Sequence, residues 1–154
     1  MTTLRFKETD RGYSVLLKRV LELAKPRISV GVHAAEGGAA KTNGTTVLDV
    51  AMRAEFGLGQ PMRSWLRAWY DEHYRVGYDE IRKVLQTVIS GKRALTPSLE
   101  MLGQRFVGLI QQRISQRIPP PNAPATVKAK GSSTPLVDSG QFRSSITYRV
   151  KSGN

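Results

Sequence analysis

Apolar residues recur every three or four positions in four stretches of this chain, which is the spacing that places them on one face of a helix. The stretches cover residues 10–25, 46–56, 64–90 and 96–118. Polar and charged residues occupy the positions between them, so each stretch has an apolar and a solvated face. The pattern predicts two short and two long amphipathic helices, the third of them bent or split at Gly77.

The ends of these stretches carry residues that start and stop helices. The capping candidates are Thr9 or Asp10 for the first helix, Thr45 or Thr46 for the second, and Thr96, followed by Pro97, for the fourth. Pro26 ends the first helix because proline disfavours helical geometry in the residue before it. Gly57 ends the second, where a left-handed residue is wanted, and the prolines at 119–121 end the fourth.

Two short stretches alternate apolar and polar residues, as a strand with one buried face does. They are Ile28–Val32 and Ile146–Val150, and a further stretch at 2–7 fits an edge strand with Leu4 and Phe6 on one face. Because a single short strand cannot bury its face alone, we expect the first two to pair with each other.

These elements predict an α+β fold and a single domain over residues 1–154. A small antiparallel or mixed sheet, with strands near 28–33 and 146–151, packs against several amphipathic helices. Residues 34–44 are rich in Ala and Gly, and residues 119–134 in Pro, Ala, Lys, Gly and Ser. Neither segment has an apolar period, so we expect mobile loops, the second of them an extended arm.

The charge balance changes the picture, because 24 Lys and Arg stand against 12 Asp and Glu, a net charge of +12. A chain this basic is expected to bind polyanions without sequence preference and with strong salt dependence. The candidate DNA-facing or interface residues are Arg63, Arg67, Arg75, Arg105, Arg113, Arg117, Lys128 and Lys130. A basic, non-specific DNA-binding accessory protein is therefore one interpretation of the sequence.

Residue types that carry catalysis or hold metals are sparse. Without cysteine, the chain has no disulfide, no thiolate metal site and no cysteine nucleophile. His33 and His73 fall in separate elements, and the acidic pairs at 71–72 and 79–80 interleave with Arg and Lys, which favours ion pairing on a helix face. We expect no catalytic, metal-binding or cofactor-binding residues, and hence a protein that is not an enzyme.

The aromatic residues Trp65, Trp69 and Tyr70 lie near Arg63 and Arg67. Such a group can stack on single-stranded nucleic acid, but at helical spacing it is more typical of a core or a subunit interface, which is the interpretation we favour. The first residues lack the basic start and apolar run of a secretion signal, and no run approaches the roughly 18 apolar residues of a membrane span. We expect no association with membranes.

Three segments carry short motifs in a fixed order. Residues 50–57 end in Glu-Phe-Gly, residues 61–67 read Pro-Met-Arg-Ser-Trp-Leu-Arg, and residues 135–146 read Pro-Leu-Val-Asp-Ser-Gly-Gln-Phe-Arg-Ser-Ser-Ile. The set resembles the tail-completion and virion-morphogenesis proteins of tailed bacteriophages, in which the second motif is Pro-x-Arg-Pro-Phe-Leu-Arg and the third Pro-Leu-x-Asp-Thr-Gly-x-Leu-x-x-Ser-Ile. The chain departs from that pattern at Ser64, Trp65, Ser139 and Phe142.

The resemblance covers about residues 28–150 and implies a non-enzymatic structural protein of the head–tail connection, synthesised in the host cytoplasm and located in the virion. It implies a homo-oligomeric ring, hexameric or dodecameric, around the DNA channel. The implied partners are connector and neck proteins, the tail tube or the tail terminator, with non-specific contact to packaged DNA.

The motif residues also have physical roles that need no appeal to the family. Gly57 permits a turn, Pro61 and Arg63 set the next helix, and the residues after them anchor it to the core. The residues before Phe142 turn the chain so that this side chain points inward. We expect the following to hold the fold: Glu55, Phe56, Gly57, Pro61, Arg63, Trp65, Leu66, Asp138, Ser139, Gly140, Phe142 and Ile146.

Overall fold

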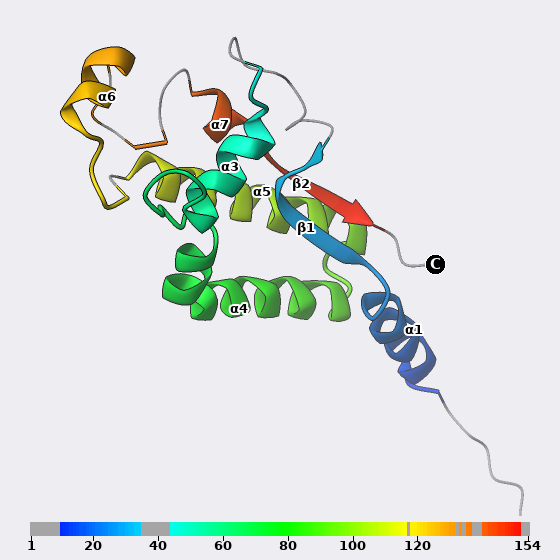
Figure 1. Ribbon diagram of the computed structural model, residues 1–154. Helices are drawn as coiled ribbons and strands as arrows, with labels where there is room; N and C mark the ends of the chain where they lie inside the picture. Colours follow the sequence, from blue (N-terminus) through cyan, green and yellow to red (C-terminus); the bar gives the residue numbers. More distant parts are fainter. Residues whose placement is uncertain are drawn as a thin grey trace, which may run out of the picture.

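The structure, a computed structural model, describes residues 10–34, 44–116, 118–131, 133, 135–136 and 140–151. Its elements are α1 (Tyr13–Leu23), β1 (Arg27–Val32), α3 (Val47–Phe56), α4 (Arg67–Ile89), α5 (Leu95–Ser115), α6 (Pro124–Lys130), α7 (Gln141–Ser144) and β2 (Ile146–Lys151). The fold is α+β, as the sequence predicts: mostly helical, with a small sheet (Figure 1).

The pairing predicted for the two strands is confirmed, and it is antiparallel. The register places Ile28 opposite Val150, Val30 opposite Tyr148, and Val32 opposite Ile146. Every second residue of the two strands therefore belongs to one of three apolar cross-strand pairs, and these pairs lie on one face of the sheet. A two-stranded sheet is marginal in water by itself, so this face needs a partner.

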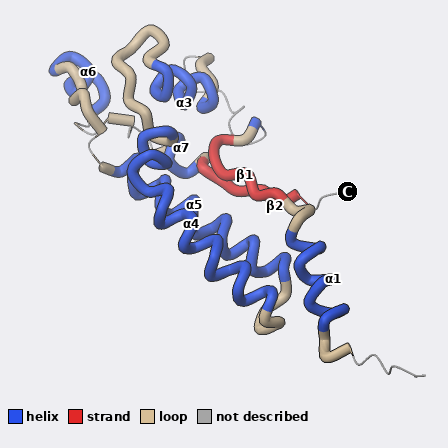
Figure 2. Tube along the Cα trace, turned by 90° about the horizontal axis from the view of Figure 1, so that it is seen from below, coloured by secondary structure: helices blue, strands red, loops and turns tan. Residues whose placement is uncertain are grey.

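Helix α5 is that partner, and it lies between the sheet and α4 (Figures 1 and 2). It contacts both strands, while α4 packs along its other side. A bidentate ion pair joins the two helices, with Arg113 Nη1 and Nη2 at 2.9 and 3.0 Å from the carboxylate oxygens of Glu72. The layers are thus sheet, α5 and α4.

The hydrophobic core lies where α3, the start of α4, α5, α7 and β2 meet. Its buried members are Val47, Ala51, Ala54, Trp65, Trp69, Ile110, Ile114, Ile118, Phe142 and Ile146. The expectation that Trp65 and Trp69 belong to the core is confirmed, whereas Tyr70 is 54% exposed.

Helix α1 stands at the edge of the molecule, beside the C-terminal end of α4 (Figure 2). Arg19 Nη1 donates to the carbonyl oxygen of Ile89 at 3.1 Å, but no residue of α1 is buried. The helix predicted at 10–25 is confirmed in a shorter form. Asp10 does bond the backbone N–H of Ser14, at 3.3 Å, although the helix itself starts after Gly12.

Several predicted boundaries are wrong. α5 begins at Leu95 after Ala94, so Thr96 and Pro97 lie inside its first turn and Thr96 is not its cap. α4 begins at Arg67 instead of Ser64, and it runs without a break through Gly77. The second short helix is capped as expected, by Thr46, whose hydroxyl accepts from the N–H of Asp49 at 3.0 Å.

The sequence predicts an extended arm at residues 119–134. This prediction is wrong for Pro124–Lys130, which forms helix α6. Pro124 occupies the first turn, where a missing N–H is harmless, and Gly131 closes the helix in a left-handed conformation with φ 68°. The strand expected at 2–7 and most of the loop expected at 34–44 lie outside the described residues. Over the parts of the chain that are described, no helix is long and apolar enough to cross a bilayer.

The contact between α5 and β2 yields a test of this packing. A Cβ added at Gly103 would lie 2.5 Å from Cγ and 3.0 Å from Cβ of Tyr148, and the Cβ cannot move away unless the backbone of β2 moves with it. We expect Gly103→Ala to lower the unfolding free energy by about 1–2 kcal/mol, since overpacking outweighs the roughly 1 kcal/mol that alanine gains over glycine in a helix.

The matched control is Gly108→Ala in the same helix, where an added Cβ meets nothing within 4 Å. This variant should gain up to about 1 kcal/mol. Urea denaturation of both variants measures the difference. Equal stabilisation by the two substitutions would show that α5 and β2 are not in this close contact.

Candidate functional site

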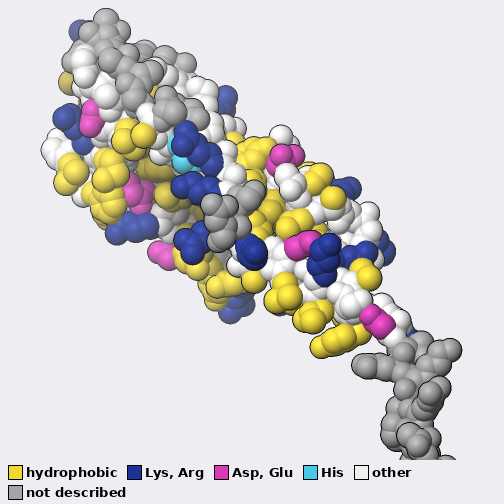
Figure 3. All heavy atoms as spheres, turned by 90° about the vertical axis from the view of Figure 1, so that its right-hand side faces the viewer, with side chains coloured by type: hydrophobic (Ala, Val, Ile, Leu, Met, Phe, Trp, Pro, Cys, Tyr) yellow, Lys and Arg dark blue, Asp and Glu magenta, His cyan; other side chains and the backbone are white. Residues whose placement is uncertain are grey.

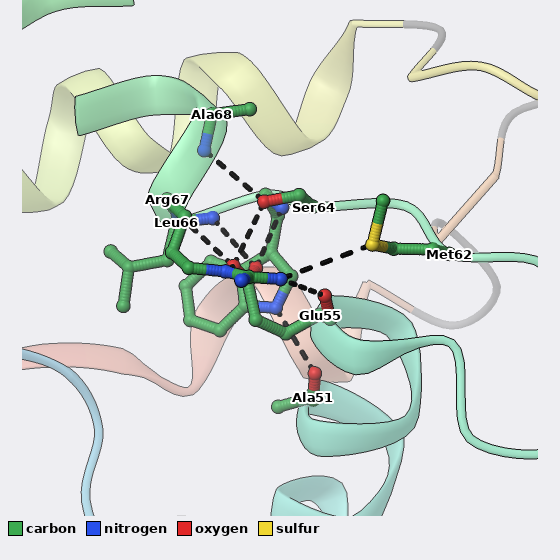
Figure 4. Close-up of polar contacts among 8 residues, drawn as sticks. Ala51, Glu55, Met62, Ser64, Leu66, Arg67 and Ala68 are labelled. Atoms are coloured by element: carbon green, nitrogen blue, oxygen red, sulfur yellow. Dashed lines mark hydrogen bonds and ion pairs between the residues drawn. The ribbon is translucent and has the colours of Figure 1, made fainter. Parts of the chain in front are cut away.

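The residues of the first two motifs meet at the carboxylate of Glu55, in the last turn of α3 (Figure 4). Its oxygens accept the backbone N–H of Trp65 at 2.9 Å, of Leu66 at 3.0 Å and of Arg67 at 3.1 Å. The hydroxyl of Ser64 donates to it as well, at 2.8 Å. Glu55 is only 5% exposed, so a buried negative charge satisfies the N–H groups at the start of α4.

A second set of contacts holds the same two helices from the solvent side. Arg67 Nε donates to Glu55 at 2.9 Å, and Arg67 Nη2 donates to the carbonyl of Glu55 at 3.0 Å. The guanidinium lies 5.0 Å from the centre of the half-exposed Phe56 ring. Gly57 then turns the chain at φ 71°, as predicted. The Glu-Phe-Gly motif is therefore a joint between α3 and α4.

Arg63 ties a distant segment to this joint. It is 7% exposed, and its Nε and Nη2 donate to the carbonyl oxygens of Pro120 and Pro121 at 2.8 and 3.2 Å. These prolines, with the exposed Pro61, line a cavity of about 380 Å³. Because its guanidinium is buried against backbone carbonyls, the expectation that Arg63 faces DNA is wrong, and it holds the fold instead.

The third motif joins through Phe142. This ring packs edge-on against Trp65, with the ring centres 5.2 Å apart, and the indole N–H of Trp65 donates to the carbonyl of Ala51 at 3.1 Å. Phe142 and Ile146 are each 2% exposed. Gly140 starts α7 with φ 78°, a conformation that favours glycine. The motif residues Asp138 and Ser139 lie outside the described residues.

The remaining basic candidates are spread over three helices. Arg75 on α4, Arg105 on α5 and Lys128 on α6 are exposed, and α6 lies far from α4 (Figure 1). Arg113 is bound to Glu72, with its side chain 17% exposed, so its charge is engaged between α4 and α5. Arg117 and the side chain of Lys130 are outside the described part of the chain. Arg75 also donates to the hydroxyl of Tyr74 at 3.1 Å, and its guanidinium lies 5.8 Å from the centre of that ring.

The polar residues considered for chemistry have structural partners. His33 bonds Ser29 at 3.0 Å and Thr147 at 2.9 Å, and His73 bonds the carbonyl of Trp69 at 3.1 Å. Ion pairs of Asp79 and Glu80 with the cations three residues on follow the pattern expected for a solvated helix face. Among the residues that are described, no group of three or more His, Asp or Glu could hold a metal ion.

A feature of α4 that the sequence reasoning missed is a ladder of exposed tyrosines. Tyr70, Tyr74 and Tyr78 follow one another at 6.5 and 6.3 Å between ring centres, and they are 41–58% exposed. A side-chain hydrogen bond with Tyr78 raises the pKa of Tyr70 above its ordinary value of 10.0. The sequence does contain a signal for this ladder, which is a tyrosine at every fourth position. The tryptophans next to Tyr70 favour a core or interface role for it and obscure the repeat.

Comparison of the chain with models of protein families, with curated proteins and with solved structures gave no match. The resemblance to phage proteins accordingly rests on the three motifs.

The joint at Glu55 yields a prediction with a pH signature. Burial raises the pKa of Glu55, but the hydrogen bonds from Leu66, Arg67 and Ser64 outweigh burial, and the pKa lies below its ordinary value of 4.5. A depressed pKa means that ionised Glu55 stabilises the folded state above pH 4.5. This stabilisation is lost as the pH falls through the pKa of the folded protein.

We expect Glu55→Gln to lower the unfolding free energy at pH 7 by about 1–3 kcal/mol, because an amide nitrogen would face N–H donors. The difference in unfolding free energy between this variant and the unsubstituted protein should become smaller as the pH falls below 4.5. Glu100→Gln, at an exposed position of α5, is the control and should change stability by less than about 0.5 kcal/mol. Denaturant unfolding from pH 7 to pH 3 measures both, and a constant difference would contradict the ionised cap.

Proposed function

We propose that this protein is a structural component of a tailed-phage virion, placed at the head–tail connection and assembled as a homo-oligomeric ring around the DNA channel. The observation that carries the proposal is the convergence of the three motifs. Glu55, Arg63 and Trp65 come from neighbouring segments and Phe142 from a segment far along the chain, yet they form one contiguous cluster. The ordered motifs therefore behave as one structural unit, which supports reading them together.

The roles of these residues also fit a scaffold. The carboxylate of Glu55 is occupied by helix capping, Arg63 by backbone carbonyls, and the indole N–H of Trp65 by Ala51. Polar groups that are fully engaged within the fold are not available to act on a substrate. A protein built in this way acts through its surfaces.

Those surfaces support assembly. Large apolar side chains are exposed along α1 and along α4, in addition to the tyrosine ladder. Figure 3 faces α1 and shows a row of hydrophobic side chains over that helix. Contiguous exposed apolar surface marks interaction sites in soluble proteins.

The proposal predicts where the protein is found and what its loss does. In the phage that encodes this chain, a deletion should leave filled heads and finished tails that do not join. Supplying the protein from a plasmid should restore joining, and antibody labelling should mark the neck of intact particles. Electron microscopy reads all three results. Normal particles from the deletion strain, or label elsewhere on the particle, would contradict the proposal.

A second candidate function, favoured by the net charge of +12, is a basic DNA-binding accessory protein. Under the ring proposal, DNA contact is weak, independent of sequence and steeply dependent on salt, since phosphate contacts release counterions. Arg105→Ala should then reduce the slope of log K against log salt by about 1. Gln104→Ala, at its exposed neighbour, should not change the slope. Binding that depends on sequence and barely on salt would favour the accessory protein instead.

A further inference from the structure

Helix α1 presents an apolar face that no other described segment of its own copy covers. Five large side chains on one side of this helix are 42–69% exposed: Tyr13, Leu16, Leu17, Val20 and Leu21. Their spacing of three and four residues aligns them as one stripe. An isolated helix of 11 residues is marginal in water, so α1 depends on contacts for its stability. Helix α1 contacts the end of α4 through Arg19, and this contact does not cover the stripe.

Helix α4 presents a second apolar face of a different shape. Tyr70, Tyr74, Tyr78 and Ile81 lie on one side of it and are 37–58% exposed. Between them is an apolar hollow of about 220 Å³, whose lining also includes Trp69, Gly77 and Phe106. Gly77 has no side chain to fill the space, so the ladder forms the walls of a groove.

The two faces fit each other in length and in shape. The apolar stripe of α1 runs from Tyr13 to Leu21, about 12 Å at 1.5 Å per residue, and Tyr70 to Ile81 spans about 16 Å, so the stripe of α1 fits within the length of the groove. The leucines of α1 project from a convex helix, whereas the tyrosine groove is concave. Two grooves placed face to face would leave both hollows empty, which close packing disfavours.

The groove is not filled by α1 of the same copy. That helix is held beside Ile89, which lies eight residues beyond Ile81, or about 12 Å farther along α4. A second copy of the chain has no such restraint, and it carries a free α1 face of the required length.

We propose that the apolar face of α1 of one copy packs into the tyrosine groove on α4 of the next copy. The two surfaces differ, so the contact is head-to-tail, and repetition closes a ring when the rotation between copies permits. The inference rests on the proposed function for the ring, but the contact itself needs only the protein.

The area available is adequate for such a contact. Nine large side chains, each about half exposed, offer roughly 800 Å² if each buries on the order of 150–250 Å² when fully covered. Each of the two faces contributes about half of this area, which lies within the roughly 300–600 Å² of the largest apolar patch on a typical monomer, a patch that is often functional. The total of the two faces is about half of a standard interface of about 1,600 Å², before the polar rim is added.

Cross-linking tests the pairing directly, because the chain has no cysteine of its own. Leu17→Cys in α1 and Tyr74→Cys in α4 are made in separate full-length proteins. After oxidation, a mixture of the two variants should give a disulfide-linked dimer, and neither variant alone should give one. A variant carrying both cysteines should give a ladder of linked oligomers. Val15→Cys, exposed on the opposite side of α1, should not link to Tyr74→Cys.

Charge substitution tests the energetics. Leu17→Glu and Tyr74→Glu should each raise the dissociation constant for self-association by at least about tenfold, because they place a charge in an apolar contact. The controls have matching exposure but lie on other helix sides: Val15→Glu in α1 and Val76→Glu in α4. Sedimentation equilibrium measures the mass, and circular dichroism confirms that all four variants are folded.

Each outcome decides the matter. Loss of mass in Leu17→Glu and Tyr74→Glu but not in the controls, with cross-links in the mixture alone, supports the contact. A protein that stays monomeric at high concentration overturns it. Oligomers unaffected by these two substitutions, or disulfide-linked dimers formed by Leu17→Cys alone or by Tyr74→Cys alone, overturn it while leaving a ring through other surfaces. If the contact holds but the protein is absent from virions, the proposed function fails and the contact stands.

Discussion

The fold depends on one buried carboxylate. Glu55 ends α3 and accepts three consecutive backbone N–H groups at the start of α4, where no carbonyl of the helix itself can reach. Burying a charge is costly unless it is fully bonded, and here Ser64 and Arg67 supply the remaining donors. The geometry leaves one direction for α4 relative to α3, which fixes the position of every residue farther along α4.

The same joint collects parts of the chain that local structure alone would leave apart. Arg63 holds the carbonyls of Pro120 and Pro121, just beyond α5, and Trp65 packs against Phe142, just before β2. These contacts bring the C-terminal half of α5 into relation with α3 and α7. The two-stranded sheet is stable in this setting because α5 covers its apolar face, closely enough at Gly103 that a methyl group has no room.

Periodicity predicted the elements whose burial repeats along the chain, including the pairing of Ile28–Val32 with Ile146–Val150, because side-chain spacing reports burial directly. It failed where the deciding contact is to the backbone. Arg63 looks like any surface arginine in sequence, yet its partners are proline carbonyls. The composition of Pro124–Lys130 suggested an arm, but Pro124 and Gly131 are good helix ends. The groove at Gly77 needed the three-dimensional position of Phe106.

The joint and the proposed contact between copies lie on the same helix, and this has a physical consequence. The carboxylate of Glu55 fixes the N-terminal end of α4, the tyrosine groove occupies the next turns, and α1 is held at the C-terminal end through Arg19 and Ile89. A single continuous helix, α4, therefore sets the distance between the apolar face of α1 and the tyrosine groove within each copy. Because an α-helix is stiff over 23 residues, that distance is the same in every copy, which is the condition for head-to-tail contacts to repeat with a constant rotation.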